Sequence, residues 1–147
     1  MSESTITYCS TCGSKNRVDR SKLSQGLSPV CGKCKQPLLQ TGQPVTVTDA
    51  SFLVDVVQSP MPVLMDLWAP WCGPCRAMAP VLDEVAAAMA GRVRVVKLNV
   101  DENPVTAARF KVSSIPTLVI LKDGREVERL VGGQSKLQLI QRLERTL

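Results

Sequence analysis

The sequence predicts an α/β fold, in which a central mixed sheet carries helices on both faces, preceded by a small module of different composition. Three observations predict it. From residue 45 onward, strand-sized apolar segments alternate with helix-sized amphipathic segments, as in layered α/β domains. Residues 63–68 are almost continuously apolar, which is typical of a strand covered on both faces. The chain before residue 39 is polar and carries two Cys-x-x-Cys pairs.

The segment from residue 45 to the end reads as elements in the order βαβαβαββα. The expected ranges are 45–47, 63–68, 93–100, 117–121 and 126–131 for the strands and 49–58, 72–89, 104–110 and 135–147 for the helices. Thr48 or Asp49 is expected to be the N-cap of the first helix, and Pro80 to kink the second. An Asp-Gly pair at 123–124 predicts a hairpin turn. The apolar face of the closing helix is expected to hold Leu137, Ile140 and Leu143.

Composition and hydropathy exclude several classes of protein. The apolar runs are strand-sized, far short of the roughly 20 residues of a membrane helix, so no membrane span is expected. No basic segment followed by an apolar one is visible at the start, so we expect no secretory signal and a cytoplasmic location. The chain has no histidine, which leaves Cys, Asp, Glu, Lys and Tyr for any chemistry.

The six cysteines fall into three Cys-x-x-Cys pairs, at 9 and 12, 31 and 34, and 72 and 75. In a secreted protein they could form three disulfides, but without a secretory signal metal binding or catalysis is favoured. Composition changes near residues 36–44, and we expect a zinc-ribbon-like module with four cysteine ligands at 1–38, a linker at 39–44 and a second domain at 45–147.

The first two cysteine pairs predict a structural zinc site. The head, residues 1–38, is shorter than the roughly 40 residues at which unaided folding becomes improbable, so it needs a staple. Eighteen residues separate its two pairs, within the spacing typical of one closed tetrahedral zinc site. Gly13 and Gly32 would permit the tight turns. A disulfide or redox role is the alternative for these four ligands, which are Cys9, Cys12, Cys31 and Cys34.

The net charge of +5 is concentrated in the head and linker, where residues 1–44 carry six bases against two acids and the remainder carries twelve against eleven. Four thiolates and one Zn²⁺ would lower the charge of this segment to about +2. Tyr8 is its single aromatic residue for base stacking. The sequence therefore favours a solvated basic face over a nucleic-acid interface.

Residues 63–76 read Val-Leu-Met-Asp-Leu-Trp-Ala-Pro-Trp-Cys-Gly-Pro-Cys-Arg and resemble the active-site segment of thioredoxins. The match continues through 96–101, 115–117 and 131–132, so it covers essentially all of 45–147. With the four-cysteine head added, the chain resembles the bacterial zinc-containing thioredoxin 2 class. The resemblance implies a thioredoxin fold, reduction of disulfides in protein substrates, recycling by an NADPH-dependent thioredoxin reductase, and no bound organic cofactor. We expect a monomer.

Cys72 and Cys75 are the expected redox pair. Cys72 stands at a strand-to-helix junction, where free backbone N–H groups and the helix dipole lower the pKa of a thiol. It is therefore the expected nucleophile, and Cys75, expected to be more buried, resolves the mixed disulfide. Gly73 permits close approach of a substrate backbone, and Pro74 suits the first turn of a helix. The alternative is a metal knuckle or a pair of inert buried thiols.

Asp66 lies inside the apolar strand at 63–68, where burial should raise the pKa of its carboxyl group. We expect it to exchange a proton with Cys75, directly or through water, since no histidine is available for the task. Lys97 is the matching position of the family on the next strand and could pair with Asp66. A buried structural ion pair is the alternative.

The resemblance also implies a docking surface for substrates. The family places a cis-proline at Ile115-Pro116, although the sequence does not show the isomer. The Ile115 backbone would then pair with an extended substrate strand beside Cys72. The expected surface comprises Trp71, Gly73, Pro74, Ile115, Pro116, Val131 and Gly132. Trp68 is expected only to pack beneath the site.

A different class of function stays open beside the enzyme. In this alternative, the chain is a zinc-dependent binding or redox-sensing module, whose head recruits partners or releases metal on oxidation. Within the enzyme class, Gly-Pro between the cysteines resembles reducing members more than oxidising ones.

Overall fold

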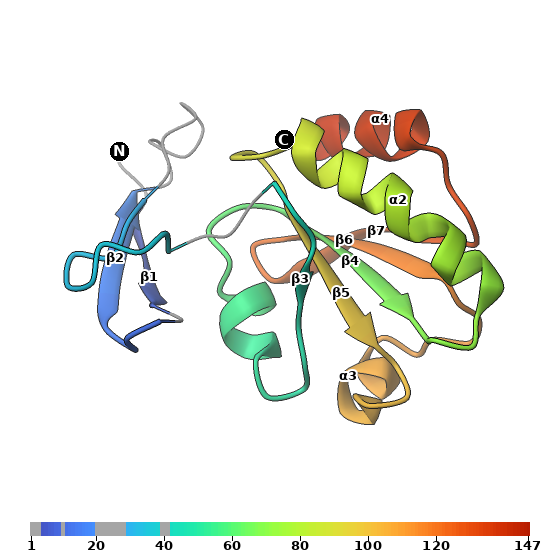
Figure 1. Ribbon diagram of the computed structural model, residues 1–147, viewed down its shortest axis with the longest axis horizontal. Helices are drawn as coiled ribbons and strands as arrows, with labels where there is room; N and C mark the ends of the chain where they lie inside the picture. Colours follow the sequence, from blue (N-terminus) through green and yellow to red (C-terminus); the bar gives the residue numbers. More distant parts are fainter. Residues whose placement is uncertain (1–3, 10, 20–28, 39–41) are drawn as a thin grey trace.

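The computed structural model describes residues 4–9, 11–19, 29–38 and 42–147. Within these ranges the chain forms a two-stranded antiparallel sheet of β1 (Ser4–Tyr8) and β2 (Lys15–Asp19) and a five-stranded sheet in the order β3-β5-β4-β6-β7 (Figure 1). The expected linker at 39–44 lies partly outside the described residues, which omit 39–41. None of the described helices has the length and apolar character needed to span a membrane.

The larger sheet carries helices on both faces, as predicted. Its elements are, in chain order, β3 (Val45–Thr46), η1 (Leu53–Val57), β4 (Val63–Trp68), α2 (Gly73–Ala88), β5 (Arg94–Asn99), α3 (Pro104–Arg109), β6 (Thr117–Lys122), β7 (Arg125–Val131) and α4 (Lys136–Thr146). β3, β5 and β4 run parallel, whereas β4 with β6 and β6 with β7 pair antiparallel. In Figure 1, α2 and α4 cover one face, and α3 lies toward the other.

The central strand β4 faces two hydrophobic cores, because successive side chains of a strand point to opposite faces. Leu64 packs with residues of α2 and α4 on one side. Met65 and Leu67 pack with Phe52 and Phe110 on the other. This arrangement explains the continuous apolar run of β4. The Cys72 motif follows the C-terminal end of this central strand and begins α2.

Two helix predictions need correction. The first helix is a short π-helix, η1, that begins at Leu53. Of the two predicted N-cap residues, Thr48 accepts a hydrogen bond at Oγ1 from Ser51 N–H, at 3.2 Å, in the turn before η1, whereas Asp49 does not cap it. The Asp49 carboxylate instead accepts hydrogen bonds from the N–H groups of Val105 and Thr106, at 3.2 and 2.8 Å, and so caps α3. In α4 the predicted apolar face is wrong at Leu137, which is 65% exposed. The fully buried residues of α4 are Leu139 and Leu143.

The predicted hairpin turn joins β6 to β7. Asp123 and Gly124 both have positive φ, 54° and 77°. A Cβ atom on Gly124 would lie 2.9 Å from the backbone oxygen of Val57, so this position requires glycine for both its conformation and its contact with η1.

A third, small hydrophobic cluster joins the head to the loop before β4. Met61, which is 6% exposed, packs there with Cys9, Val18, Cys31 and Leu38. The side chain of Ser59 fixes this loop by donating a hydrogen bond to Met61 O at 2.7 Å. Within the described residues, the buried Met61 thus joins the cysteine-rich head to the larger domain.

Candidate functional site

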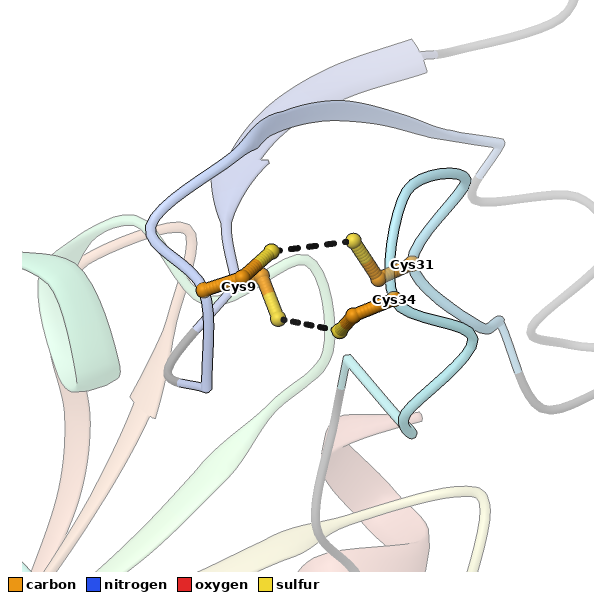
Figure 2. Close-up of side chains that lie close together, drawn as sticks. Cys9, Cys31 and Cys34 are labelled. Carbon is orange, nitrogen blue, oxygen red and sulfur yellow. Dashed lines mark hydrogen bonds between the residues drawn. The ribbon is translucent and has the colours of Figure 1, made fainter.

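The four cysteines of the head gather around one point. Their Sγ atoms all lie within 4.8 Å of one another, and two separations, Cys9 to Cys34 and Cys12 to Cys31, are 3.6 Å. A tetrahedral zinc with Zn–S bonds of about 2.3 Å has sulfur atoms about 3.8 Å apart. In Figure 2 the sulfur atoms of the labelled cysteines point toward a common centre. The distances and the donor set therefore fit a zinc site with four cysteine ligands.

Two turns with matching backbone hydrogen bonds present these thiols. In each, the first cysteine donates its N–H to the carbonyl five residues later, at 2.8 Å, and its own carbonyl accepts from the N–H four residues later. That fourth residue has a left-handed backbone, with φ of 77° at Gly13 and 65° at Lys35. Lys35, and not Gly32, therefore adopts the left-handed conformation in the second turn. A Cβ on Gly32 would only contact Asn16 Oδ1, at 3.7 Å.

The Asn16 side chain links the two turns. Its Nδ2 donates to Ser14 O at 3.1 Å and lies 3.5 Å from Cys31 Sγ, while its Oδ1 accepts from Gly32 N–H at 3.0 Å. The backbone N–H of Lys33 also points at Cys31 Sγ, at 3.4 Å. Such outer hydrogen bonds orient metal-ligating sulfur atoms. The sequence did not reveal Asn16, because no spacing rule singles out an amide on β2.

The surroundings shift the pKa values of three of these thiols in different directions. Backbone N–H groups, that of Cys34 first, lower the pKa of Cys31 to about 5, and those led by Cys12 lower the pKa of Cys9. At Cys34 a bond from Gln36 N–H lowers the pKa, but desolvation and the neighbouring thiols outweigh it and raise the pKa to about 11. Like charges this close oppose further ionisation, and a divalent cation between them would remove that opposition.

Cys72 and Cys75 form a disulfide at the N-terminus of α2, with their Cα atoms 5.2 Å apart. Cys72 is the N-cap residue, and its Sγ accepts a hydrogen bond from Cys75 N–H at 3.2 Å. Pro74 lies in the first turn, where its missing N–H costs no hydrogen bond. Cys72 and Cys75 are 5% and 3% exposed, so the expected difference in burial is small. In general, a helix N-terminus favours the thiolate form of a cysteine placed there.

The loop before β6 and the end of β7 meet beside this disulfide. Cys72 Sγ lies 3.8 Å from the carbonyl oxygen of Ile115, and the Ile115-Pro116 peptide bond is cis. Pro116 O accepts a hydrogen bond from Gly132 N–H at 2.8 Å. Val131, 57% exposed, precedes that glycine. The structure thus brings together these residues, which lie far apart in the sequence.

Trp71 borders a groove that the loop before β6 also lines. The indole is 69% exposed, and its Nε1 donates to Asp101 Oδ2 at 2.9 Å. Gly73 and Pro74 are exposed beside it. The groove has a volume of about 460 Å³ and is lined by Trp71, Val100, Pro104, Ala107, Val112, Ser113, Ser114 and Ile115. The contributions of α3 and Asp101 were missed in the sequence, since nothing in the local pattern places α3 next to Trp71.

Asp66 is fully buried on β4, and among the described residues neither of its carboxyl oxygens has a hydrogen-bond partner. Burial raises the pKa of Asp66 to about 7, against a smaller lowering by the charge of Lys97. Lys97 occupies the facing register position on β5. Its Nζ, however, lies over the ring of Trp68, 4.8 Å from the centroid. The raised pKa agrees with the sequence prediction, whereas a hydrogen-bonded Asp66–Lys97 ion pair is not formed.

Two family models match this chain. Residues 43–145 match the thioredoxin model, and residues 8–36 match the model described as thioredoxin 2, N-terminal, a zinc ribbon. The thioredoxin of Synechocystis sp. is 54% identical over 101 residues, which are 69% of this chain and 94% of that protein. The thioredoxin of Alicyclobacillus acidocaldarius subsp. acidocaldarius is 57% identical over 95 residues, which are 65% of this chain and 90% of that protein. The thioredoxin of Mycobacterium bovis is 54% identical over 99 residues, which are 67% of this chain and 85% of that protein.

These matches cover the two parts of the chain that carry the cysteines, and they agree with the mixed sheet, the disulfide at the start of α2 and the gathered thiols of the head. The chain belongs to the thioredoxin family of disulfide oxidoreductases and carries the zinc-ribbon module of thioredoxin 2 proteins.

Proposed function

We propose that this protein reduces disulfide bonds in other proteins, with Cys72 as the nucleophile and Cys75 as the resolving thiol. The observation that carries the proposal is the position of Cys72 at the N-cap of α2, where it forms a disulfide with Cys75 and lies 3.8 Å from Ile115 O. A thiol at a helix N-terminus has a lowered pKa, which increases the thiolate fraction near neutral pH.

The reaction has two exchange steps. In the first, the Cys72 thiolate attacks one sulfur of the substrate disulfide, a Cys72–substrate bond forms, and the other substrate sulfur leaves as a thiolate. In the second, the Cys75 thiolate attacks Cys72 Sγ, the disulfide of α2 forms, and the remaining substrate sulfur leaves. Two electrons pass to the substrate, and the protein ends oxidised. Solvent protons convert the released thiolates to thiols.

Asp66 is proposed to accept the proton of the Cys75 thiol before the second step. The support is a buried carboxyl group on the face of the sheet that α2 covers, with a pKa of about 7. A proton acceptor works best when its pKa lies near the working pH. Lys97 is proposed to adjust that pKa through its charge.

Substrates are proposed to bind across the surface around the disulfide. An extended substrate segment would pair with the backbone of Ile115 and contact Trp71, Gly73, Pro74, Pro116, Val131 and Gly132. The oxidised protein is proposed to be recycled by an NADPH-dependent thioredoxin reductase, which would use the same exposed surface. We propose that the protein acts as a monomer.

The head is proposed to hold one structural zinc ion through Cys9, Cys12, Cys31 and Cys34. The matching turns and the sulfur separations support this assignment. When bound, zinc supplies a staple for a module that is too small to fold unaided. We further propose the division into 1–38, 39–44 and 45–147, and a reducing cytoplasm as the location, because that compartment keeps such thiols available for metal.

The test is turnover of a protein disulfide with NADPH and a thioredoxin reductase. Cys72→Ser is expected to abolish turnover, whereas Cys75→Ser should accumulate a mixed disulfide that mass spectrometry detects as a covalent adduct. Removal of residues 1–38 is expected to leave turnover largely intact. Activity that survives Cys72→Ser would refute the proposal, and loss only on removal of the head would favour a zinc-dependent binding or redox-sensing module.

A further inference from the structure

Trp68 and Lys97 form a contact that packing alone does not explain. The Lys97 Nζ lies 4.8 Å from the centroid of the Trp68 ring, within cation–π range. Both side chains are half-buried, and a cation–π contact strengthens when it is partly desolvated. The ammonium group therefore has a defined partner on β4 that is not a carboxylate.

Asp66, Trp68 and Lys97 share one face of the sheet. Residues two apart on a strand point to the same face, so Asp66 and Trp68 lie on the side of Leu64, which α2 covers. Lys97 is the register partner of Asp66, and Asn99 is that of Trp68. The lysine can therefore contact either of two neighbours on β4, the carboxyl group of Asp66 or the ring of Trp68.

Among the described residues, few groups that titrate face Asp66. β5 contributes Lys97, whose charge acts on the carboxyl group. β6 contributes Leu118 at the register position of Asp66. The buried residues of α2 include one that can titrate, Cys75, and those of α4 are leucines. The position of the Lys97 ammonium group is thus the main electrostatic variable at this carboxyl.

The geometry points to Trp68 as a positioning residue for proton transfer, because its ring binds the Lys97 ammonium group and keeps it from pairing with Asp66. The inference rests on the proposed role of Asp66 as proton acceptor, since that role requires a carboxyl group that gains and loses a proton near neutral pH. A contacting cation lowers the pKa of a carboxyl group by about 1–3. Asp66 would then stay ionised and would bind the Cys75 proton too weakly.

The test measures the pKa of Asp66 in the full-length, zinc-loaded protein by carboxyl ¹³C NMR, beside the pH profile of disulfide reduction. In Trp68→Leu the released ammonium group is expected to pair with Asp66 and lower its pKa by about 1 or more. In the pH profile of the reduction rate, the part that depends on the protonation of Asp66 should move along the pH axis by the same amount. Trp68→Phe keeps a ring and should show a smaller shift of the same sign, and it carries the test if Trp68→Leu does not fold.

Loss of the indole could also admit water, which would lower the pKa of Asp66 without any lysine. The Lys97→Met background separates these causes, because Trp68→Leu should leave the pKa of Asp66 unchanged there. Arg109→Met, which removes a cation 5.0 Å from the Phe52 ring on the other face, is the matched control and should change nothing. The inference is overturned if Trp68→Leu lowers the pKa of Asp66 equally in the parent and in the Lys97→Met background. It is also overturned if neither Trp68→Leu nor Trp68→Phe lowers that pKa in the parent.

The two proposals can fail separately. If Asp66→Asn leaves the rate and its pH profile unchanged, Asp66 is not the proton acceptor. The NMR titration still decides whether Trp68 keeps Lys97 away from the carboxyl group, because it does not depend on turnover.

Discussion

A buried carboxyl group without a hydrogen-bond partner is costly to ionise, and Asp66 is such a group among the residues that the structure describes. Its pKa is about 7 in the folded protein, against about 3.9 in an unfolded chain. The folded state therefore binds the proton more tightly, and stability falls as pH rises from about 4 to about 7. One pKa unit corresponds to about 1.4 kcal/mol, so the full penalty is roughly 4 kcal/mol.

Asp66→Asn removes that penalty. We expect the variant to be more stable than the parent by roughly 4 kcal/mol at pH 8, with the difference shrinking toward zero near pH 4. Denaturant unfolding at several pH values measures it. A variant less stable than the parent at pH 8 would contradict the assigned pKa.

Asp49 shows the opposite sign of linkage. Hydrogen bonds from the start of α3 lower the pKa of Asp49. The Thr106 hydroxyl has the largest effect, and the N–H groups of Thr106 and Val105 add to it. The stability that this cap provides is therefore present above the unfolded pKa and lost as pH falls through the folded one. Asp49→Ala should be less stable than the parent at pH 7 and no different at the acid end of the titration. Asp83→Ala, on an exposed part of α2, is the control and should match the parent at pH 7.

For individual residues, the sequence predicted the chemical character of a side chain better than it predicted which side chains that residue contacts. A carboxylate inside an apolar strand indicated the burial of Asp66, because such a residue is rarely placed there without a partner or a role. The partners of Lys97 and Asp49 were not predictable in the same way. Both depend on side chains that meet across the fold, Trp68 in one case and Thr106 in the other.

The zinc-binding turns allow a comparison between two glycines of the same module. Gly13 has φ of 77°, a conformation that costs a residue with a Cβ about 1–2 kcal/mol. Gly32 has an ordinary backbone and room for a Cβ. Gly13→Ala is therefore expected to weaken zinc binding by about tenfold, whereas Gly32→Ala should bind zinc like the parent. Competition with a chromophoric chelator measures both, and equal affinities would show that the left-handed turn is not needed for the metal site.

Among the elements, the strands and α2 matched expectation more closely than η1 and α4. The nearly continuous apolar run of β4 predicts a buried strand, and the Cys-Gly-Pro-Cys sequence marks the start of α2, so few other secondary structures fit these two segments. In α4 the pattern predicted a face of Leu137, Ile140 and Leu143, and it was right for Ile140 and Leu143, which pack against the core. The packing against α2 also buries Leu139 and leaves Leu137 exposed.

Across the whole molecule, the division of the six cysteines into two chemistries followed from spacing and motif, because each group lies within one local segment or a pair of turns. The contact between the head and the larger domain could not be predicted from the sequence, because it depends on Met61, which lies in a loop without a recognisable sequence pattern. In Figure 1 the head lies at one end of the molecule and the start of α2 at the other. The two chemistries are thus separated in space as well as in sequence.

The buried methionine reports whether the head stays folded. Met61 is 6% exposed because Cys9, Val18, Cys31 and Leu38 cover it. Removal of the metal unfolds small zinc modules, so a strong chelator should expose Met61, while Met65 and Met89, at 0% and 1% exposure in the cores of the larger domain, stay protected. Brief treatment with peroxide followed by peptide mass spectrometry is expected to show several-fold more sulfoxide at Met61 in the chelated protein. Equal oxidation of Met61 with and without chelator would mean that the head covers this loop without its metal, and a rise at Met65 and Met89 as well would mean that the larger domain unfolds with it.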